Sequence, residues 1–435
     1  MKFAAREVAT ATGGELVGPD VDVDGLAIDS RTDVAGRLFV PIVAERDGHD
    51  YIDGARSAGA TAYLTSRPPV GGTAIVVDDT RSALGALGAR ARERLPDRIV
   101  GVTGSVGKTS VKDLLAAALA TTFTTAASER SFNNELGVPL TLANAADGTT
   151  AVVVEMGARG VGHIRLLCEI ARPTVGIVTA VGHVHTELFG TIDDVALGKG
   201  ELVESLPPTG TAVLNADDER VAAMAGRTRA SVVTYGLEGG DVMAERVVLD
   251  DELHPSFVLR SPWGEERVTL AVRGHHQVAN ALAAVAAAVA AGADLDAAVT
   301  GVERAQPSRW RMELHRTHTG ALVLNDAYNA NPISMSAALR SLAAMGARRP
   351  IAVLGTMAEL GAVADAEHLA IAELARDLDI RLVAVAEPRY GGELVDGVDA
   401  AVEAVGPLRE GDAVLVKGSR VAGLERVADA LLRGG

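Results

Sequence analysis

The segment Gly104-Ser-Val-Gly-Lys-Thr109 constrains this chain most, because it directly follows an apolar run at residues 99–102. We predict a helix over residues 108–119, so the glycine-containing loop lies between a strand and the N-terminus of a helix. At such a position the backbone amides of the loop and the positive end of the helix dipole can bind an anion. Lys108 can neutralise phosphate charge, and the Thr109 hydroxyl can ligate Mg²⁺. The segment therefore predicts a nucleotide site within an α/β fold.

Apolar runs alternate with helical patterns from residue 98 onward. The predicted strands are 99–102, 151–155, 175–181, 212–215 and 231–235 and, in a second series, 321–324, 351–354, 382–385 and 413–416. Such alternation is typical of parallel sheets covered by helices on both faces. Residues 236–273 are more polar and rich in turn signals, so antiparallel strands or loops are expected there.

The length of 435 residues exceeds the roughly 250 to 300 that one hydrophobic core serves. The first hundred residues carry short strand-like runs and end in a predicted helix, before Pro96-Asp97. The short runs are 38–43, 62–64 and 74–77, and the helix is 80–95. We predict an α/β protein of three domains: a small N-terminal α/β domain (1–97), a central phosphate-loop ATPase-like domain with a parallel sheet (98–312), and a C-terminal Rossmann-like domain (313–435).

The composition of the chain argues against several classes of binding partner. A net charge of −16 argues against nucleic acid or an anionic membrane surface as the main partner. The longest apolar run, residues 281–293, is shorter than the roughly 18 to 20 residues that span a bilayer. Met1-Lys-Phe3 does not lead into an apolar signal segment, so we expect a cytoplasmic chain without membrane insertion. The single cysteine, Cys168, excludes an internal disulfide and is expected to be a buried small hydrophobe.

Polar side chains follow two further predicted strands. Glu155 ends the run 151–155 and is a candidate metal ligand, while His183 and His185 follow the run 175–181. Lys199 lies on a helix predicted to begin near residue 193. Taken singly, such a histidine or lysine is more often structural. Carboxyl ends of parallel strands meet at one edge of a sheet, so we expect these residues near the phosphate loop.

Nine short motifs are distributed along nearly the whole chain. They are Ile28-Asp-Ser-Arg31, Gly48-His-Asp50, Gly104-Ser-Val-Gly-Lys-Thr109, Phe132-Asn-Asn-Glu-Leu-Gly-Val-Pro139, Val154-Glu-Met-Gly157, Leu214-Asn-Ala-Asp-Asp218, Asn325-Asp-Ala-Tyr-Asn-Ala-Asn-Pro332, Met357-Ala-Glu-Leu-Gly361 and Val416-Lys-Gly-Ser-Arg420. Together they resemble the Mur ligase family, and the Asn-Asn-Glu, Tyr-Asn-Ala-Asn-Pro and Lys-Gly-Ser-Arg segments favour its F-type branch. Val102 replaces the first glycine of a strict Walker motif, and this shortened loop is the form that the family uses.

The resemblance implies an ATP-dependent carboxylate-amine ligase of peptidoglycan precursor synthesis. ATP would phosphorylate the terminal carboxylate of UDP-N-acetylmuramoyl-tripeptide, and the free amine of D-alanyl-D-alanine would attack the acyl phosphate. Both the phosphoryl group and the carboxylate are anionic, so catalysis depends on charge neutralisation and alignment. We expect a monomer that takes these small molecules as its substrates.

The same resemblance implies a catalytic set of Lys108, Glu155, His185 and Lys199. Two Mg²⁺ ions are expected, the first held by Thr109 and Glu155 and the second served by His185 and Lys199. In the family the lysine that matches Lys199 is carbamylated by CO₂, which turns a cation into an oxygen ligand for a hard metal.

The resemblance also implies which residues contact the substrates, because individual positions of this chain match the family's motifs. The expected ATP contacts are Thr103, Gly104, Ser105, Val106, Gly107, Lys108 and Thr109 in the loop, Asn280 at the adenine, Arg311 at the phosphates and Asp326 at the ribose. The expected substrate contacts are Ser30 and Arg31 at the uridine and diphosphate, Asn133 and Asn134 toward the sugar-peptide, and Tyr328, Asn329 and Asn331 toward the dipeptide. These residues lie in different predicted domains, so ATP would be enclosed when the domains close.

Several positions depart from the family pattern. They are Ala180 and Gln277 where Asn is usual, His183 where a small or acidic residue is usual, Thr186 where Leu is usual, and Thr356 where Asp is usual. These departures leave the amine acceptor open. The spacing to Phe189-Gly190 favours His185 over His183 for the metal.

Three alternatives follow from these observations. The first is a ligase of the same chemistry that acts on a different UDP-sugar peptide or amine acceptor. The second is a nucleotide-binding regulator without turnover, against which the presence of Lys108, Glu155 and Lys199 argues. The third is folylpolyglutamate synthesis, against which the N-terminal region and the Tyr-Asn-Ala-Asn-Pro segment argue.

Overall fold

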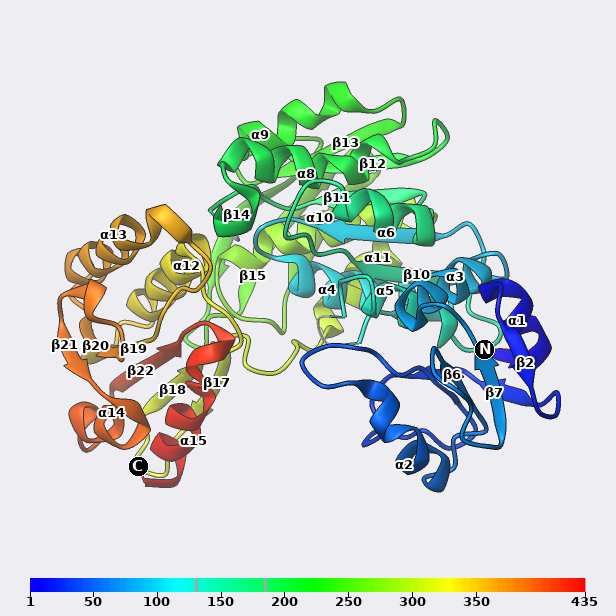
Figure 1. The fold of residues 1–435 in the computed structure, drawn as a ribbon. Helices are drawn as coiled ribbons and strands as arrows, with labels where there is room; N and C mark the ends of the chain where they lie inside the picture. Colours follow the sequence, from blue (N-terminus) through cyan, green and yellow to red (C-terminus); the bar gives the residue numbers. More distant parts are fainter. Residues whose placement is uncertain (130–131, 184–185, 435) are drawn as a thin grey trace.

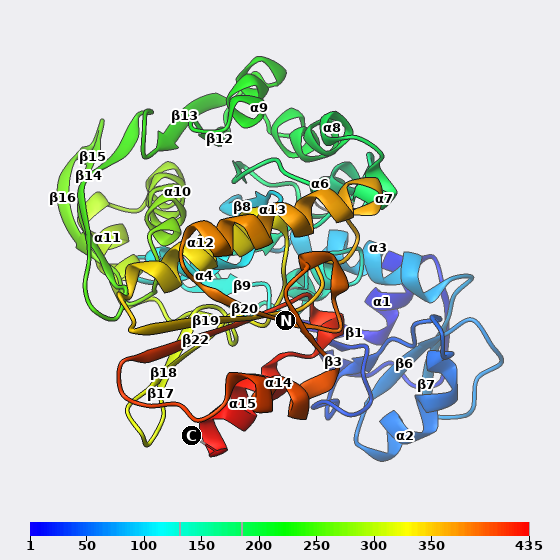
Figure 2. The same cartoon turned by 90° about the vertical axis from the view of Figure 1, so that its left-hand side faces the viewer.

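The computed structural model describes residues 1–129, 132–183 and 186–434, and three larger sheets organise them into N-terminal, central and C-terminal units. Figure 1 shows the central unit at the top, the N-terminal unit at the lower right and the C-terminal unit at the lower left. In the view turned by 90°, the C-terminal unit lies in front and the N-terminal unit beside it (Figure 2). The predicted α/β fold is confirmed.

The N-terminal unit holds a five-stranded sheet of order β2-β7-β6-β5-β4, in which only the β2–β7 pair is antiparallel. β1 (Lys2–Ala4) pairs separately with β3 (Asp22–Asp24). The other elements are β2 Glu15–Val17, β4 Leu26–Ala27, β5 Leu38–Phe39, β6 Ala62–Thr65, β7 Thr73–Val76, α1 Ala5–Thr12, η1 Gly48–Tyr51, α2 Ile52–Ser57 and α3 Thr80–Arg92. The strand predicted over 38–43 is too long: β5 ends at Phe39, shortly before Pro41, which has no N–H to donate to a ladder.

The central unit holds a nine-stranded sheet of order β16-β15-β14-β13-β12-β11-β8-β10-β9. Its strands are β8 Ile99–Thr103, β9 Thr125–Ala127, β10 Ala151–Glu155, β11 Val175–Val178, β12 Thr211–Asn215, β13 Ser231–Gly236, β14 Val242–Leu249, β15 Pro255–Ser261 and β16 Gly264–Thr269. The pairs from β9 to β14 are parallel, whereas β14, β15 and β16 form an antiparallel extension. Of the antiparallel strands or loops expected in the polar region 236–273, the structure has antiparallel strands.

Helices cover both faces of the central sheet. They are α4 Lys108–Ala120, α5 Gly137–Ala143, α6 His163–Ala171, α7 Thr186–Phe189, α8 Ile192–Glu204, α9 Glu219–Ala222, η2 Ala223–Arg227, α10 His276–Ala290 and α11 Leu295–Arg304. One core packs α4, α10 and α11 against the sheet, and residues 281–288 of α10 are all buried in it. Its helices come close because their facing residues are small, as at Gly301, where a Cβ would lie 2.4 Å from the Ala118 Cα.

A second core joins the central unit to the N-terminal unit. It includes side chains of α1 and α3 together with α5, α6 and α8. Gly88 of α3 lies so close to α5 that a Cβ there would be 2.6 Å from the Pro139 Cα. The buried Arg92 of α3 donates to the carbonyl of Ala171 at the end of α6, at 2.8 Å. Helix α3 is thus fixed against both units.

The C-terminal unit holds a six-stranded sheet of order β17-β18-β22-β19-β20-β21, parallel except for the β17–β18 pair. Its elements are β17 Glu313–Arg316, β18 Leu322–Asn325, α12 Pro332–Ala344, β19 Arg349–Leu354, η3 Gly361–Val363, α13 Ala364–Asp377, β20 Arg381–Val385, η4 Pro388–Tyr390, β21 Glu393–Val395, α14 Gly397–Val405, β22 Asp412–Lys417, η5 Arg420–Ala422 and α15 Glu425–Gly434. Helices α12 and α13 contribute to one core and α14 and α15 to another, so both sheet faces are covered. None of the helices described in the three units is long and apolar enough to cross a membrane.

Candidate active site

The phosphate loop connects β8 to α4 and depends on two glycines with positive φ. Gly104 has φ +148°, and a Cβ there would lie 1.8 Å from the Thr179 Oγ1. Gly107, the N-cap of α4, has φ +81°, and a Cβ there would lie 2.7 Å from the Asn280 Oδ1. The amide of Ser105 donates to the Ala180 carbonyl at 2.8 Å. The loop is therefore shaped by residues that follow β11 and by α10, and a Cβ at either position would force a neighbouring side chain or the loop to move.

The first residues of α4 meet the end of β10. The Thr109 hydroxyl donates to the Glu155 Oε2 at 2.9 Å, and the Asn133 amide donates to the Glu155 Oε1 at 2.8 Å. The Arg311 Nη2, from the segment that leads into the C-terminal unit, donates to the Thr109 Oγ1 at 2.9 Å. Glu155 is 1% exposed. The structure thus brings together Thr109, Glu155, Asn133 and Arg311, which are separated by up to 202 residues in the chain.

Two lysines lie in this region. Lys108 donates to the Gly104 carbonyl at 2.7 Å. Burial lowers the pKa of Lys108, and Arg311 adds to this while Glu155 opposes it. Lys199 of α8 is 2% exposed, and burial followed by repulsion from Lys108 holds its pKa well below the usual range. Within the described residues Lys199 has no hydrogen-bond or ion-pair partner, so nothing there compensates a buried ammonium.

The histidine side of the predicted second metal site is only partly described. His185 lies outside the described residues. His183 is half-buried, and its Nδ1 has no hydrogen-bond partner in the described part of the chain. No three His, Cys, Asp or Glu side chains within residues 1–129, 132–183 and 186–434 cluster as a metal site would. The two predicted metal sites each contain only one acidic or histidine ligand, Glu155 beside Thr109 and His185 beside Lys199. They therefore do not require a cluster of three such side chains.

The predicted adenine and ribose contacts lie on opposite sides of the junction between units. Asn280 donates to the Gln277 Oε1 at 2.9 Å on α10. Asp326, just after β18, accepts from the Met312 amide at 3.1 Å and from the Lys417 Nζ at 2.6 Å. Lys417 was not among the predicted site residues, although it contacts one of them here and its Lys-Gly-Ser-Arg segment carries part of the family resemblance. Its position after a buried apolar run at 413–416 was the available signal.

The segment predicted to hold the dipeptide follows Asp326. The Tyr328 ring lies 4.3 Å from the Arg311 guanidinium, and the Asn329 carbonyl accepts from Lys417 at 2.8 Å. The Asn331 side chain accepts from the Ser334 amide at 2.9 Å and so caps α12. Asn331 therefore has a structural role in this structure.

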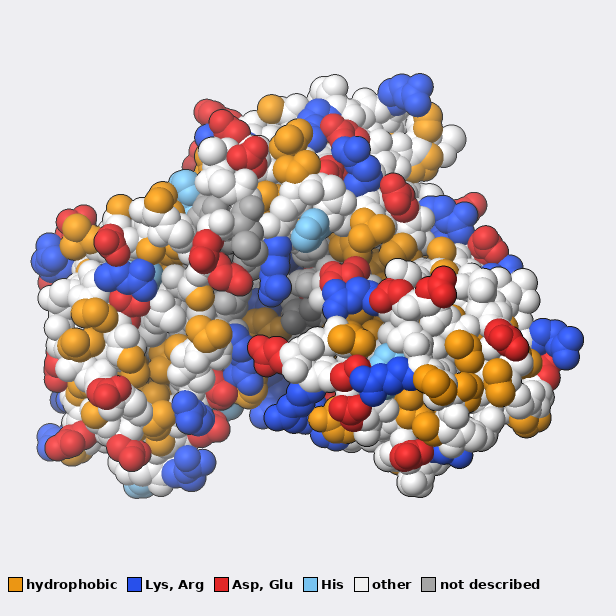
Figure 3. All heavy atoms as spheres, viewed as in Figure 1, with side chains coloured by type: hydrophobic (Ala, Val, Ile, Leu, Met, Phe, Trp, Pro, Cys, Tyr) orange, Lys and Arg blue, Asp and Glu red, His pale blue; other side chains and the backbone are white. Residues whose placement is uncertain are grey.

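The C-terminal unit touches the central unit beside this segment. A Cβ on Gly182 would lie 2.4 Å from the Ile333 Cδ1 of α12, and one on Gly361 would lie 3.2 Å from the Glu187 Cα of α7. Figure 3 shows a hollow between the N-terminal and C-terminal units, beneath the central unit, with Lys and Arg side chains along it.

The residues predicted to bind the UDP-linked substrate do not form one cluster of contacts. Arg31 is exposed and binds Asp29 through two hydrogen bonds of 2.9 and 2.7 Å. Those hydrogen bonds lower the pKa of Asp29 to about 2. Ser30 is half-buried. The Asn134 Oδ1 accepts from the Gly137 amide at 3.0 Å and helps to start α5, so this side chain is committed to local structure.

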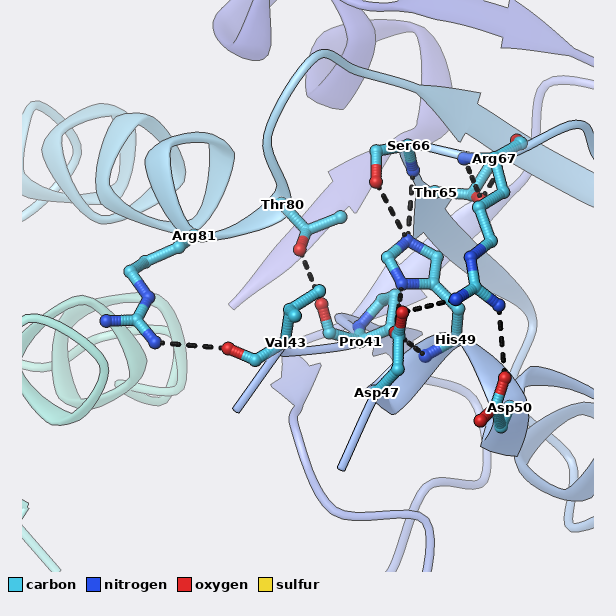
Figure 4. A network of polar contacts seen from close by, with 10 residues as sticks. All are labelled: Pro41, Val43, Asp47, His49, Asp50, Thr65, Ser66, Arg67, Thr80 and Arg81. Atoms are coloured by element: carbon cyan, nitrogen blue, oxygen red, sulfur yellow. Dashed lines mark hydrogen bonds and ion pairs between the residues drawn. The ribbon is translucent and has the colours of Figure 1, made fainter. Parts of the chain in front are cut away.

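A polar network that sequence reasoning missed holds the loop of residues 41–50 (Figure 4). The buried His49 contacts the Asp47 Oδ1 through Nδ1 at 2.6 Å, and its Nε2 accepts from the Ser66 amide at 3.1 Å. Arg67 bridges Asp47 and Asp50. The Gly48-His-Asp50 segment was the signal for this network. Its partners 17 to 20 residues away are visible only in the structure.

The loop of residues 41–50 is also linked to the segment around Asn133, whose side chain bonds Glu155. Arg81 of α3 donates to the Val43 carbonyl at 3.3 Å and to the Glu135 carboxylate at 3.2 Å (Figure 4 shows the first contact). Glu135 lies two residues beyond Asn133, which bonds Glu155. The N-terminal loop is thus connected to the segment that orients the candidate metal ligand.

Two family models match the chain: the Mur ligase middle domain over residues 102–288, and the glutamate ligase domain of Mur ligases over residues 310–420. The chain therefore belongs to the Mur ligase family. It is 40% identical to the UDP-N-acetylmuramoyl-tripeptide–D-alanyl-D-alanine ligase of Mycobacterium tuberculosis, over 93% of this chain and 91% of that protein.

Solved structures of the same kind of ligase are also similar. A crystal structure of MurF from Acinetobacter baumannii has a TM-score of 0.89 and 30% identity, and the match covers 100% of this chain and 99% of that one. MurF ligase from Thermotoga maritima in complex with ADP has a TM-score of 0.84 and 26% identity, covering 94% and 97%.

Proposed function

We propose that this chain is the ATP-dependent ligase that joins D-alanyl-D-alanine to UDP-N-acetylmuramoyl-tripeptide in peptidoglycan precursor synthesis. The single observation that carries the proposal is the cluster of Thr109, Glu155 and Arg311 at the phosphate loop. It sets hydroxyl and carboxylate oxygens and a guanidinium around the start of α4. Similarity to a UDP-N-acetylmuramoyl-tripeptide–D-alanyl-D-alanine ligase over more than nine tenths of the chain supports this choice of substrates.

The loop residues suit a nucleotide triphosphate with Mg²⁺. Hard oxygens such as those of Thr109 and Glu155 are the ligands that Mg²⁺ prefers, and Mg²⁺ would neutralise phosphate charge there. Lys108 would bind phosphate oxygens in place of the Gly104 carbonyl. Arg311 would stabilise negative charge on the transferred phosphoryl group. The peptide carboxylate would take the terminal phosphoryl group of ATP, with ADP released. The amine would then displace phosphate from the acyl phosphate, so that one C–N bond forms, one C–O bond breaks and the amine gives up one proton.

Lys199 supports a carbamate at the second metal. A buried lysine without a carboxylate partner favours its neutral amine, and the neutral amine is the form that adds CO₂. The carbamate would present oxygens to a second Mg²⁺ together with His185. A ¹³C signal from ¹³CO₂-treated protein that is absent in Lys199→Ala would support this assignment. Undiminished activity of Lys199→Ala, with no further rise on adding bicarbonate or acetate, would reject it.

The three units would divide the substrates. We infer that residues 1–97 bind the uridine end through Ser30 and Arg31, that 98–312 bind ATP, and that 313–435 hold the amine acceptor. Asn280 and Asp326 would meet the adenine and the ribose. We infer a monomer, because the phosphate loop and Arg311 come from one chain. The cytoplasm is where ATP and UDP-linked precursors are available to such an enzyme.

Release of phosphate from ATP tests the proposal. The protein is incubated with UDP-N-acetylmuramoyl-tripeptide and either D-alanyl-D-alanine or a series of single amino acids. Turnover that requires the dipeptide is the expected result. Turnover with another amine but not with the dipeptide would instead favour a Mur ligase with a different acceptor, to which the departures at Ala180, His183 and Thr356 would then be relevant.

A further inference from the structure

Arg420 and Val421 occupy the carboxyl edge of the C-terminal sheet, where ligands bind in open α/β sheets. They follow β22, which lies between β18 and β19. The preceding residue, Ser419, accepts from the Ala358 amide at 2.9 Å and donates to the Ala330 carbonyl at 3.3 Å. Arg420 therefore stands where three loops of this edge converge, including the loop expected to meet the dipeptide.

Other cations at this edge are already committed to protein partners. Lys417 is buried and donates to Asp326 at 2.6 Å and to the Asn329 carbonyl at 2.8 Å. Arg389 is bound along its Nε and Nη2 edge by the buried carboxylate of Glu387. Neither of them presents an open guanidinium or ammonium face to a new anion.

Arg420 is held in place but leaves one edge open. Its guanidinium lies 4.5 Å from the centre of the Trp310 ring, and its Nη1 forms an ion pair with the Glu425 Oε1 at 2.9 Å. Its side chain is 53% exposed, and in the described part of the chain Nε and Nη2 have no hydrogen-bond partner. These two nitrogens form the edge through which an arginine binds a carboxylate with two parallel hydrogen bonds.

Val421, the residue after Arg420 in η5, provides exposed apolar surface. At 81% exposure it is the most exposed large hydrophobic side chain among the described residues. An exposed valine that follows an arginine with an open edge suits a ligand that carries a methyl group next to a carboxylate, which is the chemistry of a C-terminal alanine.

We propose that Arg420 binds the C-terminal carboxylate of the acceptor dipeptide and that Val421 covers its terminal methyl group. The inference rests on the proposed function and assigns the acceptor's anchoring end. Trp310, on which Arg420 stacks, precedes Arg311, which contacts Thr109. With its carboxylate anchored at Arg420, an extended dipeptide of about 7 Å directs its amine away from this anchor. The C-terminal unit thereby selects small apolar dipeptides with a free carboxylate.

The test compares D-alanyl-D-alanine with D-alanyl-D-alaninamide, which has no carboxylate, in wild type and Arg420→Gln. Wild type should prefer the acid in kcat/KM by about 10- to 100-fold, the range for a charged hydrogen-bonded pair. Arg420→Gln should lose this preference through a higher KM for the acid, with the KM values for ATP and the UDP-linked peptide unchanged. Arg426→Gln, an exposed arginine at the start of α15, is the matched control and should keep the wild-type preference.

The outcomes separate the inference from the proposed function. Wild type that does not turn over with the dipeptide rejects both. Wild type that turns over, with Arg420→Gln still preferring the acid by the wild-type factor, rejects the inference alone. The same holds if Arg426→Gln loses the preference equally. Val421→Thr keeps the side-chain shape and should raise the KM for the dipeptide by about threefold, the effect of one lost apolar methyl contact, while an unchanged KM rejects the role of Val421.

Discussion

Replacement of Gly104 by alanine tests the idea that the phosphate loop is shaped by its contact with the end of β11. A Cβ at this position would lie 1.8 Å from the Thr179 Oγ1, so Thr179 or the loop must move. Thr179 donates to the Val106 carbonyl, and a rotated side chain would lose that hydrogen bond. The φ of +148° adds backbone strain of about 1–3 kcal/mol. With about 1 kcal/mol for the hydrogen bond, we expect a total loss of about 2–4 kcal/mol.

Urea unfolding and calorimetric titration with ATP measure the two consequences. Gly104→Ala should lower the free energy of unfolding by the amount above and weaken ATP binding, because the loop amides no longer converge on one anion. Gly148→Ala is the matched control, since Gly148 has φ +83° but a Cβ there would have no atom within 4 Å. That variant should lose only about 1–2 kcal/mol, the cost of a left-handed conformation, and should bind ATP as wild type does.

A double variant isolates the steric contact. In a Thr179→Ala background the colliding hydroxyl is absent, whereas the Cβ of residue 179 at 3.0 Å and the Ala180 amide nitrogen at 3.1 Å remain. Gly104→Ala should therefore cost less there than in wild type and still somewhat more than Gly148→Ala, and the double-mutant cycle should show a coupling energy of about 1–2 kcal/mol. The reasoning is refuted if Gly104→Ala costs the same in both backgrounds, or if it costs no more than the control.

Three further outcomes are expected. Asn133→Ala removes the amide that orients Glu155, so the Mg²⁺ concentration for half-maximal phosphate release should rise about tenfold, and an unchanged requirement would contradict the contact. Burial raises the pKa of Glu387, but hydrogen bonds from Arg389 outweigh this and lower it to about 2 from 4.5. The stabilisation is therefore present above pH 4.5 and is lost as the pH falls toward 2, so the urea midpoints of wild type and Glu387→Gln should differ at pH 7 and converge in that window. Burial raises the pKa of Cys168 to about 12, so the native protein should not react with a thiol reagent at pH 8, whereas the urea-unfolded chain should react once.

The sequence predicted the central strands well because they are buried on both faces and appear as continuous apolar runs. The run at 99–102 became β8, and the run at 151–155 became β10. Three of the strands that were missed in the central and C-terminal units, β9, β17 and β21, lie at sheet edges, and β1 to β4 of the N-terminal unit were missed as well. Strands β9, β17 and β21 are three or four residues long, and in β9 no residue is fully buried. Edge strands need no continuous apolar run, so the sequence carried little signal for them.

The run predicted over 175–181 was too long for a related reason. β11 ends at Val178, because the following backbone turns to the phosphate loop and to α9. The Ala180 carbonyl accepts from the Ser105 amide, and the Val181 amide donates to the Asp218 carboxylate at 2.7 Å. Apolar character continues past the strand because this turn is buried, and hydrophobicity alone cannot separate a buried strand from a buried turn.

Site residues could be predicted one by one, but their partners could not. Thr109 and Glu155 follow from a loop motif and a strand end. Their contacts with Asn133 and Arg311 depend on how distant segments pack. Lys417 was missed for the same reason, since its role lies in a contact with Asp326 that is 91 residues away.

The turn that delivers Arg311 explains why the phosphate loop and the C-terminal unit are coupled. Trp310 and Met312 flank Arg311 with φ of +58° and +54°, a left-handed backbone that costs non-glycine residues about 1–2 kcal/mol each. The contacts that offset this strain come from the C-terminal unit: Asp326 accepts from the Met312 amide, the Tyr328 amide donates to the Trp310 carbonyl at 3.2 Å, and Arg420 stacks on the Trp310 ring. The guanidinium that the turn presents binds the central unit instead, at Thr109. A movement of the C-terminal unit therefore moves Arg311 with it, so the position of this unit and the charge at the phosphate loop change together.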